Sequence, residues 1–178
     1  MKTVVLKFGG TSVGSIDRIK NVANIIRSYK KKNIGVIVVS SAMSGATNDL
    51  IKKTKELSDN FDPAEYDALL SSGEQVACAL IAGRLKHLGY QARSWMSWQL
   101  PILTDGPYGA ARISKIDKNK ISKFINKGGI SIISGFQGVN QDNRITTLGR
   151  GGTDATAIML AKFFNASECD IYTDVDGV

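Results

Sequence analysis

The sequence is poor in the residues that most often carry nucleophilic or metal-dependent catalysis. It has one histidine, His87, and two cysteines, Cys78 and Cys169, which are far apart in the chain. Neither cysteine belongs to a cluster with the spacing of metal ligands, so we expect two reduced, buried thiols and no metal site. His87 falls near the end of an expected helix, where its charge suits the helix dipole. Chemistry based on Ser–His, Cys–His or zinc sites is therefore mostly excluded.

Long hydrophobic runs are also missing. No apolar stretch approaches the roughly 20 residues that cross a bilayer, and the first residues have the pattern of a strand rather than of a signal peptide. Hydrophobic residues make up 43% and charged residues 22% of the 178-residue chain, which is ordinary for a globular protein. We therefore expect a cytoplasmic protein without a membrane partner, as one domain or as part of a larger one.

The net charge of +7 has two explanations. A basic module that binds nucleic acid is one of them, and it predicts binding that falls steeply with salt. However, the lysines are scattered over several expected helices, as in 30–32, 52–55 and 115–127, and aromatic residues do not alternate with them. We interpret them as solvated helix faces with some attraction for anionic substrates, and we expect no nucleic-acid partner.

Strand and helix patterns alternate along the chain. Apolar runs predict strands at 4–8, 34–40, 90–95, 130–134 and 169–173. Helical spacing predicts helices at about 15–31, after a cap at Thr47, at 64–70, at 76–88, after a cap at Asp117 and from Thr153 to Asn165. We expect residues 72–74 to separate two of these helices. The segment 97–116 gives no clear prediction of secondary structure. Asp142–Asn143 suggests a hairpin. This alternation predicts an α/β fold with a largely parallel sheet and helices on both faces.

The first chemical signal is the segment 7–12, KFGGTS, which directly follows the first strand. Glycines let backbone N–H groups approach a ligand closely. Such amides and one ammonium form an anion site, most often for phosphate. The spacing differs from that of the common phosphate loop, because the lysine precedes the glycines. Taken alone, the segment is explained equally well as a strand that ends in a glycine turn with a surface lysine.

The expected sheet favours the phosphate interpretation. Ligands of parallel α/β sheets bind beyond the carboxyl ends of the strands. Four polar or glycine-rich segments follow such ends, at 7–10, 40–45, 135–136 and 173–174. We therefore expect them to converge at one edge of the sheet.

A second glycine cluster, 149–154 with the sequence GRGGTD, opens a predicted helix. Its amides and the helix dipole favour an anion, and Arg150 adds a planar donor for carboxylate or phosphate. Asp154 in the first turn is either a helix-stabilising acid or the partner of Lys7 or of a substrate ammonium group. The cluster nearly matches the dinucleotide-binding fingerprint, but the third glycine is missing and no clear strand precedes it.

In this order, these segments resemble the aspartate kinases of the amino-acid-kinase superfamily. The matching segments are 7–13, 38–43, 72–74, 135–138, 146–154 and 172–178. The resemblance implies a three-layer α/β sandwich around a mainly parallel sheet. It also implies the reaction of ATP, with Mg²⁺, and L-aspartate to give ADP and 4-phospho-L-aspartate, at the start of lysine, threonine and methionine biosynthesis. Dimers are common in that family.

The resemblance also assigns roles to residues. Lys7 would contact the transferred phosphoryl group, and Asp154 would organise Lys7. Glu74 would pair with the aspartate ammonium and Arg150 with a carboxylate, while Phe136 would either wall this pocket or pack under its loop. The implied ATP site contains Lys7, Phe8, Gly9, Gly10, Thr173 and Asp174. The implied aspartate site contains Ser41, Thr47, Glu74, Phe136, Arg150, Gly151, Gly152 and Thr153.

The family pattern continues beyond the position that matches Val178, with the rest of a nucleotide-binding half and then regulatory ACT domains. We therefore expect residues 1–178 to form an incomplete catalytic domain, with the aspartate-binding half and the start of the nucleotide half, and with an exposed strand edge. A non-catalytic fragment or a small protein that binds aspartate or another anion is the alternative.

Overall fold

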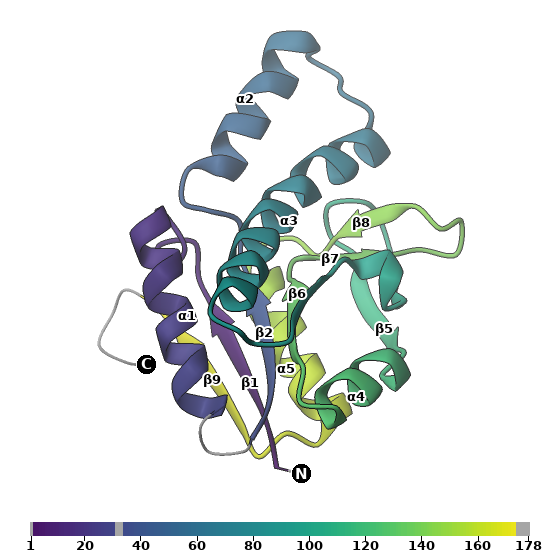
Figure 1. Ribbon diagram of the computed structural model, residues 1–178. Helices are drawn as coiled ribbons and strands as arrows, with labels where there is room; N and C mark the ends of the chain where they lie inside the picture. Colours follow the sequence, from purple (N-terminus) through teal and green to yellow (C-terminus); the bar gives the residue numbers. More distant parts are fainter. Residues whose placement is uncertain (1, 31–33, 174–178) are drawn as a thin grey trace.

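A five-stranded parallel sheet forms the centre of the computed structural model, which describes residues 2–30 and 34–173 (Figure 1). The strand order is β3-β6-β2-β1-β9, and every neighbouring pair is parallel. The strands are β1 (Thr3–Phe8), β2 (Gly35–Ser40), β3 (Ala92–Trp95), β6 (Ile130–Ser134) and β9 (Glu168–Tyr172). Phe8 is in register with Ser40 on one side and with Tyr172 on the other. The predicted parallel sheet is confirmed, and its carboxyl ends meet at one edge.

Helices cover both faces of this sheet. Helices α1 (Ile16–Lys30) and α3 (Pro63–His87) pack with Leu6 and the other residues of one face, whereas α4 (Asn119–Asn126) and α5 (Gly152–Phe164) pack with Val5 and the other face. Successive residues of β1 thus enter opposite cores, as the strand period requires. The predicted three-layer α/β architecture is confirmed.

A second sheet, with strand order β5-β4-β7-β8, lies beside the first. Its strands are β4 (Ile102–Asp105), β5 (Arg112–Ile116), β7 (Gln137–Val139) and β8 (Ile145–Thr147), and a 3₁₀ turn, Ser97–Gln99, precedes β4. The hairpin expected around Asp142–Asn143 is confirmed as the antiparallel pair β7–β8. Strands β4 and β5 were not predicted, because β4 alternates between buried and exposed residues over only four positions and β5 does not alternate.

Two expectations about helices were wrong. Helix α2 (Ala46–Leu57) is capped by Gly45 in the left-handed region, with φ 84°, so Thr47 lies inside the first turn. Residues 72–74 do not separate two helices, because α3 runs unbroken for 25 residues from its cap at Asp62. Gly73 is tolerated there because the helix passes very close to Ala42: a Cβ at position 73 would lie 2.8 Å from the Ala42 Cβ.

Smaller differences concern single residues. Lys118 occupies the cap position of α4, although the Asp117 carboxylate accepts a hydrogen bond from the Asn119 N–H at 2.9 Å. Cys78 is buried as expected, but Cys169 on β9 is only half-buried. No helix within residues 2–30 and 34–173 combines the length and the apolar character that crossing a membrane requires.

Candidate active site

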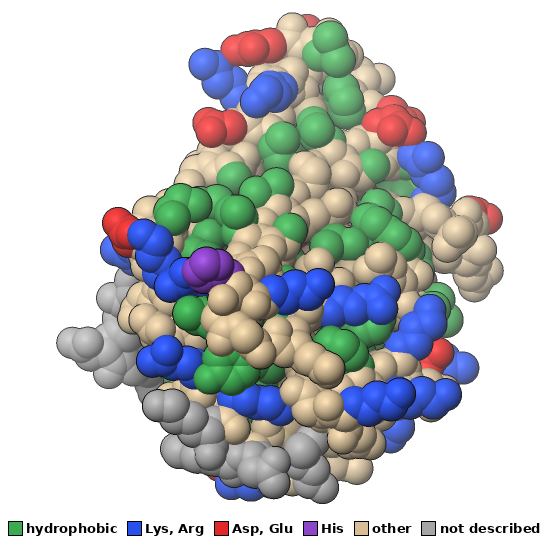
Figure 2. Space-filling model, in the orientation of Figure 1, with side chains coloured by type: hydrophobic (Ala, Val, Ile, Leu, Met, Phe, Trp, Pro, Cys, Tyr) green, Lys and Arg blue, Asp and Glu red, His purple; other side chains and the backbone are tan. Residues whose placement is uncertain are grey.

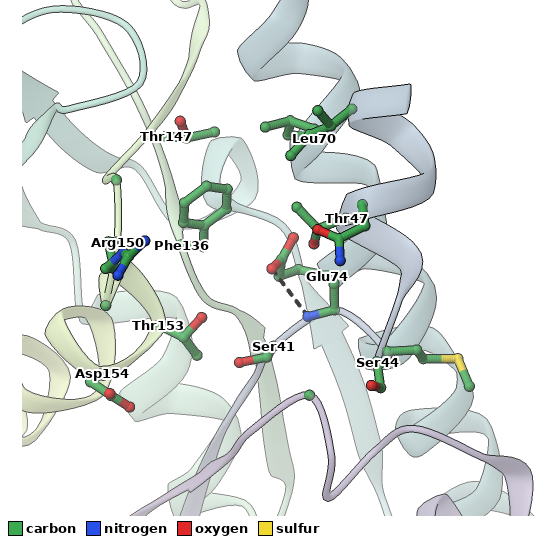
Figure 3. A pocket seen from close by; sticks show the side chains of 18 of the residues that line it. Ser41, Ser44, Thr47, Leu70, Glu74, Phe136, Thr147, Arg150, Thr153 and Asp154 are labelled. Carbon is green, nitrogen blue, oxygen red and sulfur yellow. Dashed lines mark hydrogen bonds between the residues drawn. The ribbon is translucent and has the colours of Figure 1, made fainter. Parts of the chain in front are cut away.

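A cavity of about 660 Å³ opens where the carboxyl ends of β1 and β2 face the starts of α2 and α5. One wall comes from the residues after β2 and from α2 and α3, and the other comes from Phe136 and the glycine cluster before α5 (Figure 3). Predicted site residues from both ends of the chain line it, namely Lys7, Gly10, Ser41, Thr47, Glu74, Phe136, Arg150, Gly151, Gly152, Thr153 and Asp154.

Lys7 and Asp154 form an ion pair in the lining of this cavity. Lys7 lies on β1 and is only 9% exposed. Its Nζ lies 2.8 Å from the Asp154 Oδ1, although the two residues are 147 positions apart. Asp154 is in the first turn of α5, where a carboxylate also suits the helix dipole. The sheet and the helix thus bring a buried ammonium and a carboxylate together, and the Asp154 side chain stays 44% exposed toward the cavity.

Glu74 supplies a buried carboxylate to the opposite wall. Its Oε1 accepts a hydrogen bond from the Ala42 N–H at 3.1 Å, whereas its buried Oε2 has no partner among the described residues. Burial raises the pKa of Glu74 from 4.5 to about 7, against the lowering effect of the Ala42 N–H. Figure 3 shows this side chain between Thr47 and Phe136, pointing into the open space. A cationic group of a ligand would complete its hydrogen bonding.

Two helix starts add positive potential. The caps of α2 and α5 are Gly45 and Gly151, both in the left-handed region and neither with a side chain that bonds the first turn. Glycine is favoured at such positive φ angles. The first amides, of Ala46 and Gly152, donate to the Met43 and Gly149 carbonyls, and the amides that follow them in the first turn can receive an anion. Arg150 lines the same cavity, is exposed, and forms no ion pair with a described residue. The site therefore combines anion donors with one buried acid.

The sequence left two roles open for Phe136, lining the pocket or packing under its loop, and its position is consistent with both. It lines the cavity, and it also packs against the start of α5, where a Cβ at Gly152 would lie 2.9 Å from its ring. Its φ is 67°, which is unusual for an aromatic residue. Its N–H donates to the Thr156 Oγ1 at 3.2 Å, and its carbonyl accepts from the Leu148 N–H at 2.9 Å. These contacts hold the strained residue in place.

Part of the predicted ATP site is placed differently. The Phe8 side chain is fully buried and stacks on Tyr172, with ring centroids 4.7 Å apart, so it faces the core. The Gly9 N–H donates to the Tyr172 carbonyl at 3.2 Å and is not free for a phosphate. Thr173 is exposed and lines a smaller hollow beside Phe8 and Tyr172. Asp174 lies outside the described residues.

Asp67 is a buried residue that the sequence analysis missed. It is fully buried on α3, and its carboxylate accepts hydrogen bonds from the Gly109 N–H, the Thr147 N–H and the Thr147 Oγ1, at 2.9, 2.7 and 2.8 Å. Gly109 and Thr147 line the cavity, so Asp67 holds part of its wall. The available signal was helical spacing, since Asp67, Leu70, Ser71 and Glu74 share the buried stripe of α3.

Ser44 also lines the cavity and belongs to the segment 40–45 that was expected at this edge. Other lining residues were not predicted: Asn48 and Ile51 come from α2, and Tyr66 and Leu70 from α3. In the part of the chain that the structure describes, no group of three or more His, Cys, Asp or Glu side chains could hold a metal ion.

This fold, with a cavity at the carboxyl ends of its parallel strands, defines a class of protein. The sequence profile described as the amino acid kinase family matches residues 2–178, and the chain belongs to that family.

Within the family, the chain is similar to aspartate kinases. It is 49% identical over 181 residues to the aspartokinase of Rickettsia conorii, covering 100% of this chain and 45% of that protein. The crystal structure of aspartate kinase from Synechocystis superposes with a TM-score of 0.84 at 38% identity, over 98% of this chain and 29% of that one. Aspartokinase III of E. coli, in complex with aspartate and ADP, gives a TM-score of 0.86 at 28% identity, over 99% and 50%. The chain thus spans half or less of each of these proteins.

Proposed function

We propose that this chain supplies the aspartate-binding and phosphoryl-transfer part of an aspartate kinase, which uses ATP to phosphorylate the side-chain carboxylate of L-aspartate. The observation that carries the proposal is the shared cavity: the Lys7–Asp154 ion pair, 2.8 Å apart, lines the same cavity as Glu74, whose buried Oε2 has no partner among the described residues. The similarity to an aspartokinase that binds aspartate and ADP supports this choice of substrates.

The cavity matches the charges of L-aspartate. Glu74 would accept hydrogen bonds from the α-ammonium, which would return the pKa of this glutamate toward its ordinary range. Arg150 would bind the α-carboxylate through its planar fork. Ser41, Thr47 and Thr153 would donate or accept at the remaining polar atoms, and Phe136 would limit the length of the substrate.

The transfer step needs no general base, because the side-chain carboxylate of aspartate is ionised at neutral pH. One of its oxygens would attack the γ-phosphorus of ATP, and the bond from that phosphorus to the bridging oxygen would break, with its electron pair leaving on ADP. Phosphoryl transfer depends mainly on positioning and on neutralising charge. Lys7 would neutralise the moving group, and Asp154 would hold the Lys7 ammonium in place.

The nucleotide would approach from the end of β1. Gly10 lines the cavity, and a Cβ there would lie 3.1 Å from the Ala42 carbonyl oxygen, so the backbone stays bare at this point. Together with Thr173 and Asp174, Gly10 would border the phosphates, and Mg²⁺ would arrive bound to ATP.

We also propose that the protein forms a homodimer. Light scattering measures its oligomeric state.

Calorimetry tests the substrate assignment directly. We expect L-aspartate to bind, and succinate, which lacks the ammonium group, to bind much more weakly. Glu74→Gln is expected to reduce this preference for L-aspartate, while Lys2→Ala, which removes an exposed lysine, should leave it intact. Equal affinities for L-aspartate and succinate in the unchanged protein would refute the assigned role of Glu74.

Turnover tests the catalytic assignment. In a coupled ADP-release assay, Lys7→Ala should lower the rate roughly 100-fold or more, as expected when one charged donor to the transition state is lost, with an unchanged circular dichroism spectrum. Binding of L-aspartate without binding of Mg-ATP would favour the alternative of a non-catalytic aspartate-binding protein. An active Lys7→Ala variant would contradict the mechanism.

A further inference from the structure

A second hollow lies over β3 and α4 and is separate from the candidate active site. Its volume is about 410 Å³, and four of its lining side chains are cationic: Arg93, Lys120, Lys123 and Lys127. Among the described residues, no acidic side chain lines it. It shares no residue with the cavity that contains Lys7.

Three lysines of the segment 115–127 lie on one side of α4, and the fold brings the distant Arg93 of β3 beside them. Lys120, Lys123 and Lys127 recur at spacings of three and four residues and therefore share one side of the helix. The opposite side holds Ile121 and Ile125, which are buried in the core. Figure 2 shows Lys and Arg side chains over the lower right of this face, where Figure 1 draws α4. Here the structure concentrates positive charge that the sequence alone did not localise.

Arg93 stacks on the ring of Trp95, which forms the aromatic floor of the hollow. Its guanidinium carbon lies 3.9 Å from the centre of the Trp95 ring, and this ring meets Phe124 edge-to-face at 5.8 Å. Stacking fixes the plane of the guanidinium and leaves the N–H groups at its edge available for hydrogen bonds. The indole N–H of Trp95, itself buried, has no hydrogen-bond partner within residues 2–30 and 34–173.

The positive charge of this hollow is not compensated. None of the four cations forms an ion pair with an acidic group of the described residues, and Lys120 only donates to the Gln99 carbonyl at 2.9 Å. Charges of one sign held around a single hollow repel each other and attract a counter-charge. Several oxygens on one small molecule can satisfy several of these donors together.

We propose that this hollow is a binding site for a small, multivalent phosphate-bearing anion. Its volume lies within the range of pockets that hold small metabolites, roughly 300 to 1,000 Å³. The four cations lie around one open hollow that only seven of the described residues line, and this small extent suits a compact anion better than an extended nucleic-acid backbone. The site is independent of the function proposed above, because it uses none of those residues.

Inorganic pyrophosphate is a suitable probe, because the two tryptophans of the chain report on different places. Trp95 lines the hollow, whereas Trp98 is 43% exposed and lies outside it. We expect a titration followed by the two indole N–H signals in NMR to move the Trp95 signal saturably and the Trp98 signal far less. Trp98→Phe assigns the two signals. The response should persist in the Lys7→Ala variant, which separates it from binding at the candidate active site.

A matched pair of variants tests the specificity of this site. Lys123→Gln with Lys127→Gln should weaken binding roughly 100-fold, about tenfold for each charge-assisted hydrogen bond that is lost. Lys52→Gln with Lys53→Gln removes the same charge from the exposed surface of α2 and should change the affinity little. Equal weakening by both pairs, or no saturation at millimolar pyrophosphate, would overturn the proposal. Tighter, steeply salt-dependent binding of a single-stranded oligonucleotide at Trp95 would overturn it in favour of a nucleic-acid surface.

Discussion

At the scale of single residues, Glu74 has the most unusual environment in the candidate site. Its carboxylate is buried, and one oxygen lacks a partner in the described part of the chain, so the charged form is disfavoured and the pKa rises to about 7. Between its ordinary value of 4.5 and about 7, the folded protein keeps a proton that the unfolded chain releases. The free energy of unfolding should therefore fall as pH rises through this window.

This pH dependence is testable with one substitution. We expect roughly 3 kcal/mol of stability to be lost between pH 4.5 and pH 7 through Glu74, because each pKa unit corresponds to about 1.4 kcal/mol. Glu74→Gln should remove most of this slope and be more stable than the unchanged protein at pH 8. Urea unfolding followed by circular dichroism at several pH values measures it. Parallel stability curves for both proteins would exclude an elevated pKa at Glu74.

Residue types and their order predicted which segments meet at the site and the Lys7–Asp154 contact, but not its other internal contacts. Lys7, Arg150 and Asp154 were identified because glycine-rich segments after strands and before helices are typical of anion sites. Asp67 was missed because an acid in a helix usually faces solvent. The occupied amide of Gly9 could not be predicted either, since its partner, the Tyr172 carbonyl, comes from a strand far along the chain.

At the scale of elements, α3 shows why local patterns misled. Gly73 flanked by serines has the pattern of a break, yet the helix continues because its glycine permits close contact with Ala42. Boundaries that depend on local polar and apolar spacing, such as β6 and the start of β9, were predicted within one residue. Strand β4 pairs with β5 on one side and with the distant β7 on the other, and no local signal carries that second pairing.

Two glycines of α3 provide a matched test of this contact. Gly83 is exposed, with no atom within 4 Å of a Cβ built there, so Gly83→Ala should stabilise the protein by about 1 kcal/mol through helix propensity. Gly73→Ala should instead destabilise it, because the new Cβ would overlap Ala42 at 2.8 Å. Thermal unfolding of both variants measures the difference in sign. Equal stabilisation by both substitutions would show that the helix does not pack this closely on Ala42.

At the scale of the whole molecule, Asp67 joins the main layered body to the second sheet. Its carboxylate holds the end of β8 and the loop before β5 against α3. Asp67→Ala would leave buried N–H groups without acceptors, so we expect a loss of about 3 kcal/mol or more and faster hydrogen exchange at Thr147. Glu65→Ala is the control, because Glu65 bridges α3 to Arg144 of the same hairpin at the surface. Equal effects of the two substitutions would contradict a dominant role for the buried acid.

The position of Lys7 has a consequence for how the protein adapts to what it binds. Lys7 lies on β1, which pairs with β2 on one side and with β9 on the other, so its backbone has almost no freedom to move. The facing wall is different, since α2 is joined to β2 through Gly45, whose surroundings are open. We therefore expect α2, rather than β1, to adjust when a ligand binds.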